Sequence, residues 1–228
     1  MDGISILVTA WNNTEYIEEC LDSISKQIFY NDKFEVLLGI DGCKKTKEKF
    51  LEIKEKYNSI DLKAFYMKSN KGTYITTNTL AQIAKFKILL RFDSDDIMKE
   101  NMLSKIYYTF KENTDLVMFR CNNFKGSKFS LSAPLEGVMA YTKDAFEKVG
   151  GYKPWRCAAD TDFLRRLRHL RVNREIINEA LYDRRIHSDS LTQRGETRHG
   201  SPLRMKYVKE LAKSFQKIKT VVNDYEEL

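Results

Sequence analysis

Three carboxylates stand within four residues near the middle of the chain, at Asp93, Asp95 and Asp96. They follow the short apolar run Ile88–Leu90, which is typical of a strand buried on both faces of a sheet. Carboxylates this close repel one another and are costly to bury, so they need a cation or solvent nearby. A hard divalent cation is held by one or two carboxylates and shares the oxygens of a bound phosphate. The stretch predicts an Asp-X-Asp site for a metal and a nucleotide diphosphate, or else a solvated turn in which Asp96 caps the next helix.

The segments before these carboxylates alternate between strand and helix patterns. The first helix has apolar residues at i, i+3, i+4 and i+7, which gives it one buried stripe. The expected strands are Gly3–Thr9, Phe34–Ile40, Leu62–Met67 and Ile88–Leu90, and the expected helices are Ile17–Ile24, Lys44–Tyr57 and Tyr74–Lys85. This alternation predicts an α/β fold with a doubly wound, mostly parallel sheet flanked by helices. Ligands of such sheets bind outside the carboxyl ends of the strands, where the acidic cluster stands.

In the second half of the chain, the predicted strands and helices no longer alternate regularly. We expect helices at Met98–Lys111, Lys143–Val149, Asp160–Leu170 and Leu203–Ile218, strands at Asp115–Asn122 and Gly137–Tyr141, and a loop at Arg156–Ala159. We interpret residues 1–228 as one domain. Residues 1–98 form a first half with the expected nucleotide-diphosphate site, residues 99–200 a second half, and residues 201–228 a C-terminal helix.

Composition narrows the class of protein. No apolar run approaches the roughly 20 residues that a membrane helix needs, and the first residues lack the basic start of a secretory signal. The four cysteines are widely separated, without metal-binding or redox spacing, so we expect reduced thiols and a cytoplasmic location. The net charge of +7 favours an anionic partner: a sugar nucleotide, nucleic acid or a membrane surface.

With these elements placed, the chain resembles the family-2 glycosyltransferases of the GT-A fold, from Ser5 to about Thr192. The segments that carry the resemblance follow one another in the family's order. They are Ser5–Thr14, Glu35–Gly42, Asn70–Tyr74 with Asn78, Phe92–Asp96, and the group Gly137–Tyr141, Val149–Tyr152 and Ala159–Phe163. Each segment is weak evidence alone, but their shared order is a strong signal.

Three positions depart from the family pattern. Thr9 stands where the family commonly has proline, and Ile40 stands where an Asp-Asp pair usually starts, which leaves Asp41 as the carboxylate there. Ala159 replaces the usual glutamate of a Glu-Asp pair, so the base would be Asp160 or Asp162. These differences affect the base and the recognition of the donor more than they affect the metal site.

The resemblance implies transfer of a sugar from a nucleotide diphosphate with inversion at the anomeric carbon. Mn²⁺ or Mg²⁺ would neutralise the departing diphosphate, and a base would take the proton of the acceptor hydroxyl. Asp95 is the expected metal ligand, and Asp93 would contact the ribose or the metal. His187 matches a family position that often supplies a late metal ligand or a diphosphate contact, although a lone histidine is more often structural.

Asp160 is the leading candidate for the general base, and Asp162 is the second. Both carboxylates stand at the start of an expected helix, where the helix dipole alone would favour them. The sequence therefore leaves two readings open for this pair: a catalytic base, or two structural residues of a helix N-terminus.

The donor pocket is expected around the first three strands. Asp41 would accept the N–H of a uracil-type base, unless it belongs to a simple Asp-Gly turn. Other residues implied in contacts with the base, the ribose or the rest of the donor are Thr9, Trp11, Asn12, Lys71, Gly72, Asn78 and Arg185. Trp11 could instead belong to the core.

Arginines crowd the last third of the chain. Four of them, Arg184, Arg185, Arg194 and Arg198, could clamp the diphosphate through paired N–H donors. The polar segment Gln193–Gly200 is either a lid that orders on donor binding or a plain surface loop.

Three functions are consistent with these features. The first is a metal-dependent inverting glycosyltransferase that uses a nucleotide sugar, by family weight a UDP-sugar, and a saccharide or small hydroxylated acceptor. The second has the same chemistry on a hydroxymethylated pyrimidine in DNA, whose phosphates would match the positive charge. The third is a non-catalytic nucleotide-binding or glycan-binding module, which would have no need of a base.

Overall fold

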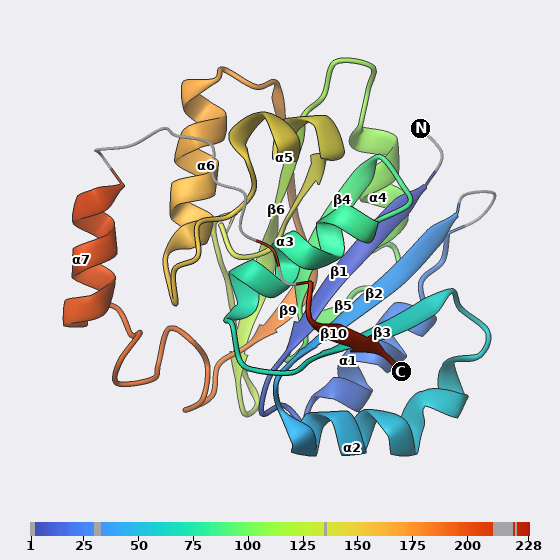
Figure 1. The fold of residues 1–228 in the computed structure, drawn as a ribbon. Coiled ribbons are helices and arrows are strands. Elements are labelled where there is room, and N and C mark those ends of the chain that lie inside the picture. Colours follow the sequence, from blue (N-terminus) through green and yellow to red (C-terminus); the bar gives the residue numbers. More distant parts are fainter. Residues whose placement is uncertain (1–2, 30–32, 135, 212–220, 222) are drawn as a thin grey trace.

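One sheet runs through the molecule, as Figure 1 shows for this computed structural model, which describes residues 3–29, 33–134, 136–211, 221 and 223–228. Within those ranges the sheet has ten strands. They are β1 (Ile4–Ala10), β2 (Phe34–Asp41), β3 (Leu62–Met67), β4 (Ile88–Asp93), β5 (Ile97–Met98), β6 (Leu116–Lys125), β7 (Lys128–Leu131), β8 (Met139–Thr142), β9 (Arg174–Arg185) and β10 (Tyr225–Glu227).

The strand order is β10-β3-β2-β1-β4-β8-β6-β9-β5, with β7 paired to β6. From β3 to β4 all neighbours are parallel. Beyond β4 the sheet is mixed, because β8 runs antiparallel to both β4 and β6, and β5 runs antiparallel to β9. The predicted α/β sheet is therefore parallel in the N-terminal half and mixed across the whole molecule. Chain order reverses direction at β1, between β2 and β4, and a crevice opens at the carboxyl ends of strands at such a point.

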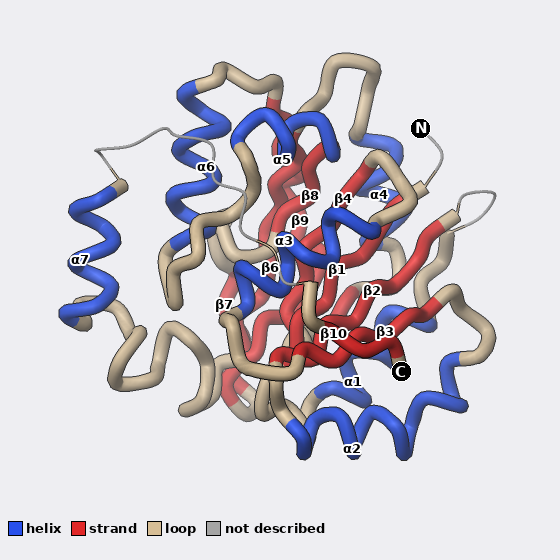
Figure 2. Tube along the Cα trace, in the orientation of Figure 1, coloured by secondary structure: helices blue, strands red, loops and turns tan. Residues whose placement is uncertain are grey.

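Helices cover both faces of the sheet, as Figure 2 shows. They are α1 (Ile17–Ser25), α2 (Lys44–Ile53) with a 3₁₀ turn (Lys54–Tyr57), α3 (Thr73–Ile83), α4 (Met102–Thr109), α5 (Lys143–Val149), α6 (Ala159–His169) and α7 (Pro202–Glu210). The helices α1, α2 and α4 pack on one face, and α3, α5 and α6 pack on the other.

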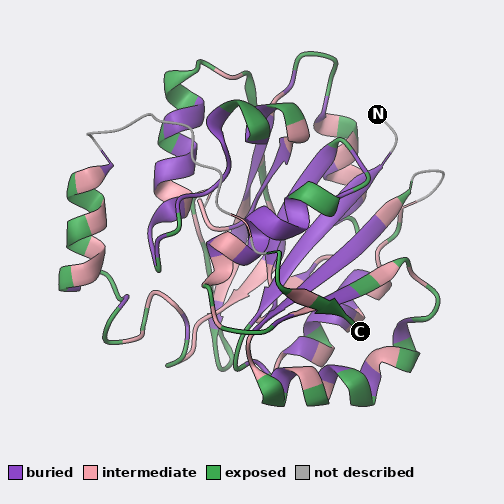
Figure 3. Ribbon diagram, viewed as in Figure 1, coloured by how far each residue is buried: buried purple, intermediate pink, exposed green. Residues whose placement is uncertain are grey.

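The central strands are buried from both sides, as Figure 3 shows. Ile6 and Val8 of β1 face one apolar cluster, and Leu7 between them faces the other. The expected stripe of the first helix is confirmed, since Ile17 and Ile24 are fully buried. All four cysteines are free thiols. None of the helices in the described ranges has the length and apolar composition that crossing a bilayer requires.

Most predicted elements are present, with three corrections. The helix expected at Met98–Lys111 begins at Met102, because Ile97 and Met98 pair with β9 as the short strand β5. The strands β7 and β9 were not predicted: no residue of β7 is buried, and only Leu181 and Tyr182 of β9 are.

The C-terminal segment is the third correction. The helix α7 ends at Glu210, whereas residues 212–220 of the predicted helix lie outside the described residues. The segment 201–228 is not a helix throughout, because Tyr225–Glu227 forms strand β10. This strand pairs with β3 and covers an edge that would otherwise present unpaired backbone groups. Tyr225 packs edge-on against Phe65, with ring centroids 5.5 Å apart.

Candidate active site

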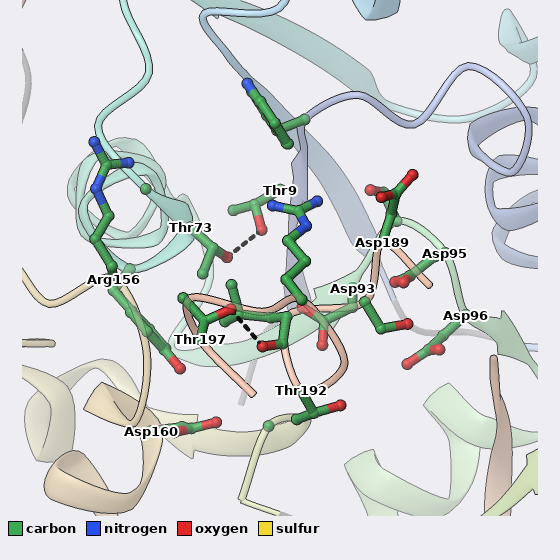
Figure 4. A pocket seen from close by; sticks show the side chains of 18 of the residues that line it. Thr9, Thr73, Asp93, Asp95, Asp96, Arg156, Asp160, Asp189, Thr192 and Thr197 are labelled. Carbon is green, nitrogen blue, oxygen red and sulfur yellow. Dashed lines mark hydrogen bonds between the residues drawn. The ribbon is translucent and has the colours of Figure 1, made fainter. Parts of the chain in front are cut away.

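A cavity of about 890 Å³ lies at the carboxyl ends of β1, β2 and β4. Loops that lead into β8 and α6, and the segment between β9 and α7, complete its walls. Its lining includes twelve of the residues that the sequence singled out for site roles: Thr9, Trp11, Asn12, Asp41, Gly72, Asp93, Asp95, Asp160, Arg184, Arg185, His187 and Arg194. Figure 4 shows that Asp95 and Asp160 lie on opposite sides of this space, with Asp93 between them.

Asp95 and His187 form a contact between distant parts of the chain. The imidazole Nε2 of His187 lies 2.8 Å from the Oδ2 atom of Asp95. His187 follows β9, and the short strand β5 brings β9 beside the acidic turn. Tyr16 packs against the imidazole at a ring-centroid distance of 4.8 Å and fixes its orientation. The expected pairing of an aspartate with a late histidine is thus present in space.

Asp96 holds the acidic turn against the end of β9. It is 3% exposed, and its Oδ1 atom accepts a hydrogen bond of 2.9 Å from the backbone N–H of Arg185. Burial raises the pKa of Asp96 well above its usual range, and the charges of Asp95 and Asp93 act in the same direction. The alternative of a solvated turn with Asp96 as a helix cap is wrong, because α4 begins only at Met102.

Asp93 faces a buried arginine. Arg91 is 3% exposed, and its Nη2 atom lies 2.7 Å from Oδ1 of Asp93. The same guanidinium donates to the hydroxyl of Thr73 at 3.2 Å and to the backbone carbonyl of Gly137. Burial raises the pKa of Asp93, while the positive charge of Arg91 lowers it. One arginine thus ties together the end of β4, the start of α3 and the loop before β8.

Asp41 organises the loop that follows β3. Its two carboxylate oxygens accept hydrogen bonds from the backbone N–H groups of Lys71 and Gly72, at 2.7 and 2.8 Å. Burial raises the pKa of this carboxyl, and the two backbone donors oppose that shift. Asp41 lines the cavity but is only 2% exposed, so its direct role in the structure is to hold this loop.

Trp11 stands at the mouth of the same pocket and is 40% exposed, so the alternative of a core tryptophan is wrong. The guanidinium of Arg194 lies over its ring at 4.6 Å. Asn12 has a φ of 51°, in the left-handed region that few residues other than glycine adopt, and turns the chain sharply after Trp11. This turn places the large aromatic ring of Trp11 in the cavity lining.

Asp160 approaches the cavity from the opposite wall. It stands in the first turn of α6 and accepts a hydrogen bond of 2.9 Å from the N–H of Thr161. The residue that precedes the helix, Ala158, has a φ of 64°, a left-handed conformation that costs a non-glycine residue about 1–2 kcal/mol. Backbone strain of this kind occurs where the surrounding structure fixes a functional side chain.

Asp162 does not line the cavity, which overturns its expected place as an alternative base. It is 1% exposed, and its carboxylate lies between Lys153, at 2.8 Å, and the Nε of Arg166, at 2.7 Å. Arg166 also donates to the carbonyls of Val149 and Gly151, at 2.6 and 2.7 Å. The pair of aspartates therefore divides: Asp160 faces the cavity, and Asp162 belongs to a buried ionic cluster.

Two residues expected to contact the donor, Asn78 and Lys71, do not line the cavity. Asn78 is buried in α3, where its amide donates to the carbonyl of Tyr152 and accepts from that residue's N–H, both at 2.8 Å. It joins the two halves of the molecule and lies outside the cavity lining. Lys71 is exposed, and its side chain is not among the lining residues either. Its contribution is the backbone N–H that holds Asp41.

The arginines expected to hold the diphosphate differ in their surroundings. Arg184 lines the cavity and donates to Thr192 at 3.1 Å. Arg185 lines it too, but its guanidinium pairs with Glu19, donates from Nε to the carbonyl of Asp95 at 3.1 Å and packs on two aromatic rings. Arg194 lies on Trp11, and Arg198 is exposed and outside the lining.

Several lining residues were missed by the sequence analysis, among them Arg91, Glu136, Arg156 and Asp189. Arg91 had a usable signal, since a lone charge inside an apolar strand needs a partner. Arg156 pairs with Asn70 across the mouth of the cavity, a contact between residues 86 positions apart that no local pattern encodes.

The donor set fits a hard divalent cation. The described residues hold no group of three or more histidine, cysteine, aspartate or glutamate side chains arranged for a metal. Asp95 lies beside His187, and Mg²⁺ that also binds substrate phosphates is usually held by one or two carboxylates. A pair of this kind holds a metal together with a diphosphate and not by itself.

Comparison with known proteins identifies the family and the fold. The model of glycosyl transferase family 2 matches residues 5–211. TarS of Staphylococcus aureus, a poly(ribitol-phosphate) β-N-acetylglucosaminyltransferase, is 30% identical over 142 residues, which are 59% of this chain and 24% of TarS. The glycosyltransferase GlyG of Streptococcus pneumoniae is 29% identical over 127 residues, 54% of this chain and 40% of GlyG. This chain thus spans well under half the length of these curated relatives.

Two solved structures share the architecture. A structure of S. aureus TarS residues 1–349 with UDP has a TM-score of 0.70 at 20% identity, and covers 82% of this chain and 61% of that one. The mannosyltransferase PcManGT from Pyrobaculum calidifontis, with GDP-Man and Mn²⁺, has a TM-score of 0.69 at 16% identity, and covers 82% of this chain and 58% of that one. The expected GT-A fold is confirmed, and the chain belongs to glycosyl transferase family 2.

Proposed function

We propose that this chain is a metal-dependent inverting glycosyltransferase that uses a nucleotide-sugar donor, with UDP as the nucleotide. The acceptor is a hydroxyl group of a saccharide or of a small hydroxylated molecule. One observation carries the proposal: a single cavity holds the Asp95–His187 pair on one side and Asp160 on the other, with Asp93 between them.

The arrangement separates the two tasks of the reaction. Asp95 and His187 would hold a Mn²⁺ or Mg²⁺ ion, which neutralises charge on the departing diphosphate. Asp160, from the opposite wall, would take the proton of the acceptor hydroxyl as its oxygen bonds to the anomeric carbon. The bond between that carbon and the diphosphate breaks on the far side, so the configuration inverts. A non-catalytic module would not need Asp160 in this position.

Known relatives support the choice of donor and acceptor class. TarS has been solved with UDP and with UDP-GlcNAc, and PcManGT with GDP-Man and Mn²⁺. TarS and a relative from Bacillus spizizenii, a poly(ribitol-phosphate) β-glucosyltransferase, act on a phosphate-linked polyol by their names. For a DNA acceptor the support is the net charge of +7. The exposed Arg165 and Arg168 of α6 do not line the cavity, so the site itself does not favour DNA.

A thermal-shift panel tests the donor site. Wild type, Asp95→Ala and the exposed control Asp144→Ala would be heated with UDP, GDP, CDP or dTDP, each with and without Mn²⁺. A nucleotide at 100 times its Kd stabilises the folded chain by about 2.7 kcal/mol. We expect a Mn²⁺-dependent shift with UDP in wild type and in the control, and its loss in Asp95→Ala. If no nucleotide shifts wild type, the proposal is wrong.

A further inference from the structure

The space above Gly137 is the most informative feature of the cavity floor. A methyl carbon built on Gly137 would lie 3.8 Å from Nη1 of Arg91, 3.8 Å from Oδ2 of Asp160 and 3.9 Å from Oδ2 of Asp93. Apart from the glycine and its chain neighbours, no described atom comes closer to that point than 3.8 Å. Three charged groups, two from β4 and one from α6, thus surround one unfilled position.

The backbone does not require glycine here. Gly137 is absent from the described residues with positive φ, so an alanine would adopt its conformation without strain. Packing does not require glycine either, because all contacts of the added methyl fall in the ordinary van der Waals range. Gly39 differs in this respect, since a methyl carbon there would lie 2.4 Å from Cγ2 of Thr76. The absent side chain at Gly137 therefore leaves room toward the cavity.

A buried contact sets the width of this space. Arg91 donates to the carbonyl of Gly137 and pairs with Asp93 at 2.7 Å, so the loop before β8 is fixed against the end of β4. Because Arg91 is only 3% exposed, water does not compete for these interactions. The floor cannot move away from an added side chain without breaking them.

We propose that Gly137 is a positioning and specificity-determining residue, which leaves open the space where the transferred sugar lies between Asp93 and Asp160. A hexose there would present its hydroxyl groups to the charged groups of both aspartates and Arg91. The nucleotide would lie farther out, toward Trp11 and Asp41. The inference rests on the proposed function, and it predicts that a methyl group at Gly137 excludes the sugar but admits the nucleotide.

The test compares Gly137→Ala with wild type on three probes: UDP, UDP-glucose and UDP-N-acetylglucosamine, each with Mn²⁺. We expect the Kd of UDP to be unchanged and the advantage of the nucleotide sugars over UDP to disappear. Turnover of the accepted UDP-sugar should fall by roughly 100-fold, as expected for reactants displaced by an ångström or more. The melting temperature should rise slightly, because alanine restricts the unfolded chain.

Gly126→Ala is the matched control. Gly126 lies in the hairpin between β6 and β7, has no atom within 4 Å of its added methyl carbon, and does not line the cavity. Its φ of 59° makes alanine strained, so this variant should melt lower than wild type yet bind and turn over donors normally. The two variants thus shift the melting temperature in opposite directions, while only Gly137→Ala lowers transfer, which separates a site effect from a folding effect.

The outcomes divide cleanly. Loss of sugar discrimination with UDP binding intact supports the inference. Normal turnover in Gly137→Ala, or an equal loss of UDP and UDP-sugar binding, overturns it while the proposed function stands. If wild type binds none of the three probes, and neither GDP nor GDP-mannose tested beside them, the proposed function fails and the inference fails with it.

Discussion

The two walls of the cavity are built in different ways. On the donor wall, Thr9, Asp41 and Asp93 each stand at or next to the end of a buried parallel strand, and Thr9 is in register with Asp93. On the acceptor wall, Asp160 stands in the first turn of a helix that follows a loop and the left-handed Ala158. Strand register places the first group, whereas the second depends on contacts made by other side chains.

Those contacts form two buried connections behind the acceptor wall. The ionic cluster of Lys153, Asp162 and Arg166 ties α6 to the loop after α5. The amide of Asn78 then ties that loop to α3 through Tyr152. We therefore expect Asp95 of the donor wall to be replaceable without unfolding, while the acceptor wall should be sensitive to residues that never touch the substrate.

The largest effect should come from Asp160→Asn. The amide cannot take a proton from the acceptor, and general bases contribute roughly 10²- to 10⁴-fold to rate. We expect sugar transfer to fall within that range while the Kd of UDP with Mn²⁺ stays as in wild type. Initial rates at saturating donor, with Asp144→Asn as an exposed control, would measure this. A loss below fivefold would assign the base elsewhere and would remove the contrast between the walls.

Asp162→Ala should have the next largest effect, on stability. It leaves Lys153 and Arg166 buried without their carboxylate, and breaking a buried ion pair on one side costs about 3–5 kcal/mol. Chemical denaturation would show a lower midpoint, and the folded fraction should still bind UDP. Transfer should fall more than nucleotide binding does, because α6 carries Asp160.

Neutral replacement of Asp162 together with Lys153 tests whether the unpaired buried charges cause the loss of stability. Lys153→Met with Asp162→Leu removes two of the three charges but still leaves Arg166 without the Asp162 carboxylate, so only part of the lost stability should return. If Asp162→Ala alone unfolds no more easily than wild type, the ionic cluster does not support the acceptor wall.

On the donor wall, Asp95→Asn should change binding and not folding. We expect at least a tenfold loss in Mn²⁺-dependent affinity for UDP, measured by calorimetry, because the carboxylate is half of the proposed ligand pair. Without ligand, the variant should melt at or above the wild-type temperature, since one of three clustered negative charges is gone. A clear drop in the melting temperature of the unliganded protein would show that the acidic turn is structural.

The contrast between the walls also explains how far the sequence alone could lead. The donor wall was predictable, because an apolar run followed by Asp93 and Asp95 encodes both a buried strand and the place where it ends. The prediction that Asp95 and His187 belong to one site came from the resemblance to the family. Its physical basis is β9, which has few buried residues and leaves no apolar signal in the sequence.

The acceptor wall shows what cannot be predicted from residues close together in the sequence. Asp160 and Asp162 are two residues apart at the start of one helix, and nothing in their spacing says which faces the cavity. Their roles are separated by Lys153, which lies on another segment and pairs with only one of them. Asn78 was assigned to the donor for the same reason, since its true partner, Tyr152, is 74 positions away.

The smallest predicted effect concerns the rim of the donor wall. Trp11→Ala removes a ring that would stack on the nucleobase, and such stacking contributes about 1–3 kcal/mol. In wild type, part of the free energy of stacking is offset, because Arg194 already covers the Trp11 ring at 4.6 Å and must give way to a base. We therefore expect a loss near the low end of that range, about fivefold in the Kd of UDP. Trp11→Phe should recover most of it, and Tyr108→Ala, on the exposed surface of α4, should change nothing. If Arg194→Gln instead tightens UDP binding while Trp11→Ala weakens it, the arginine competes with the base for one aromatic face.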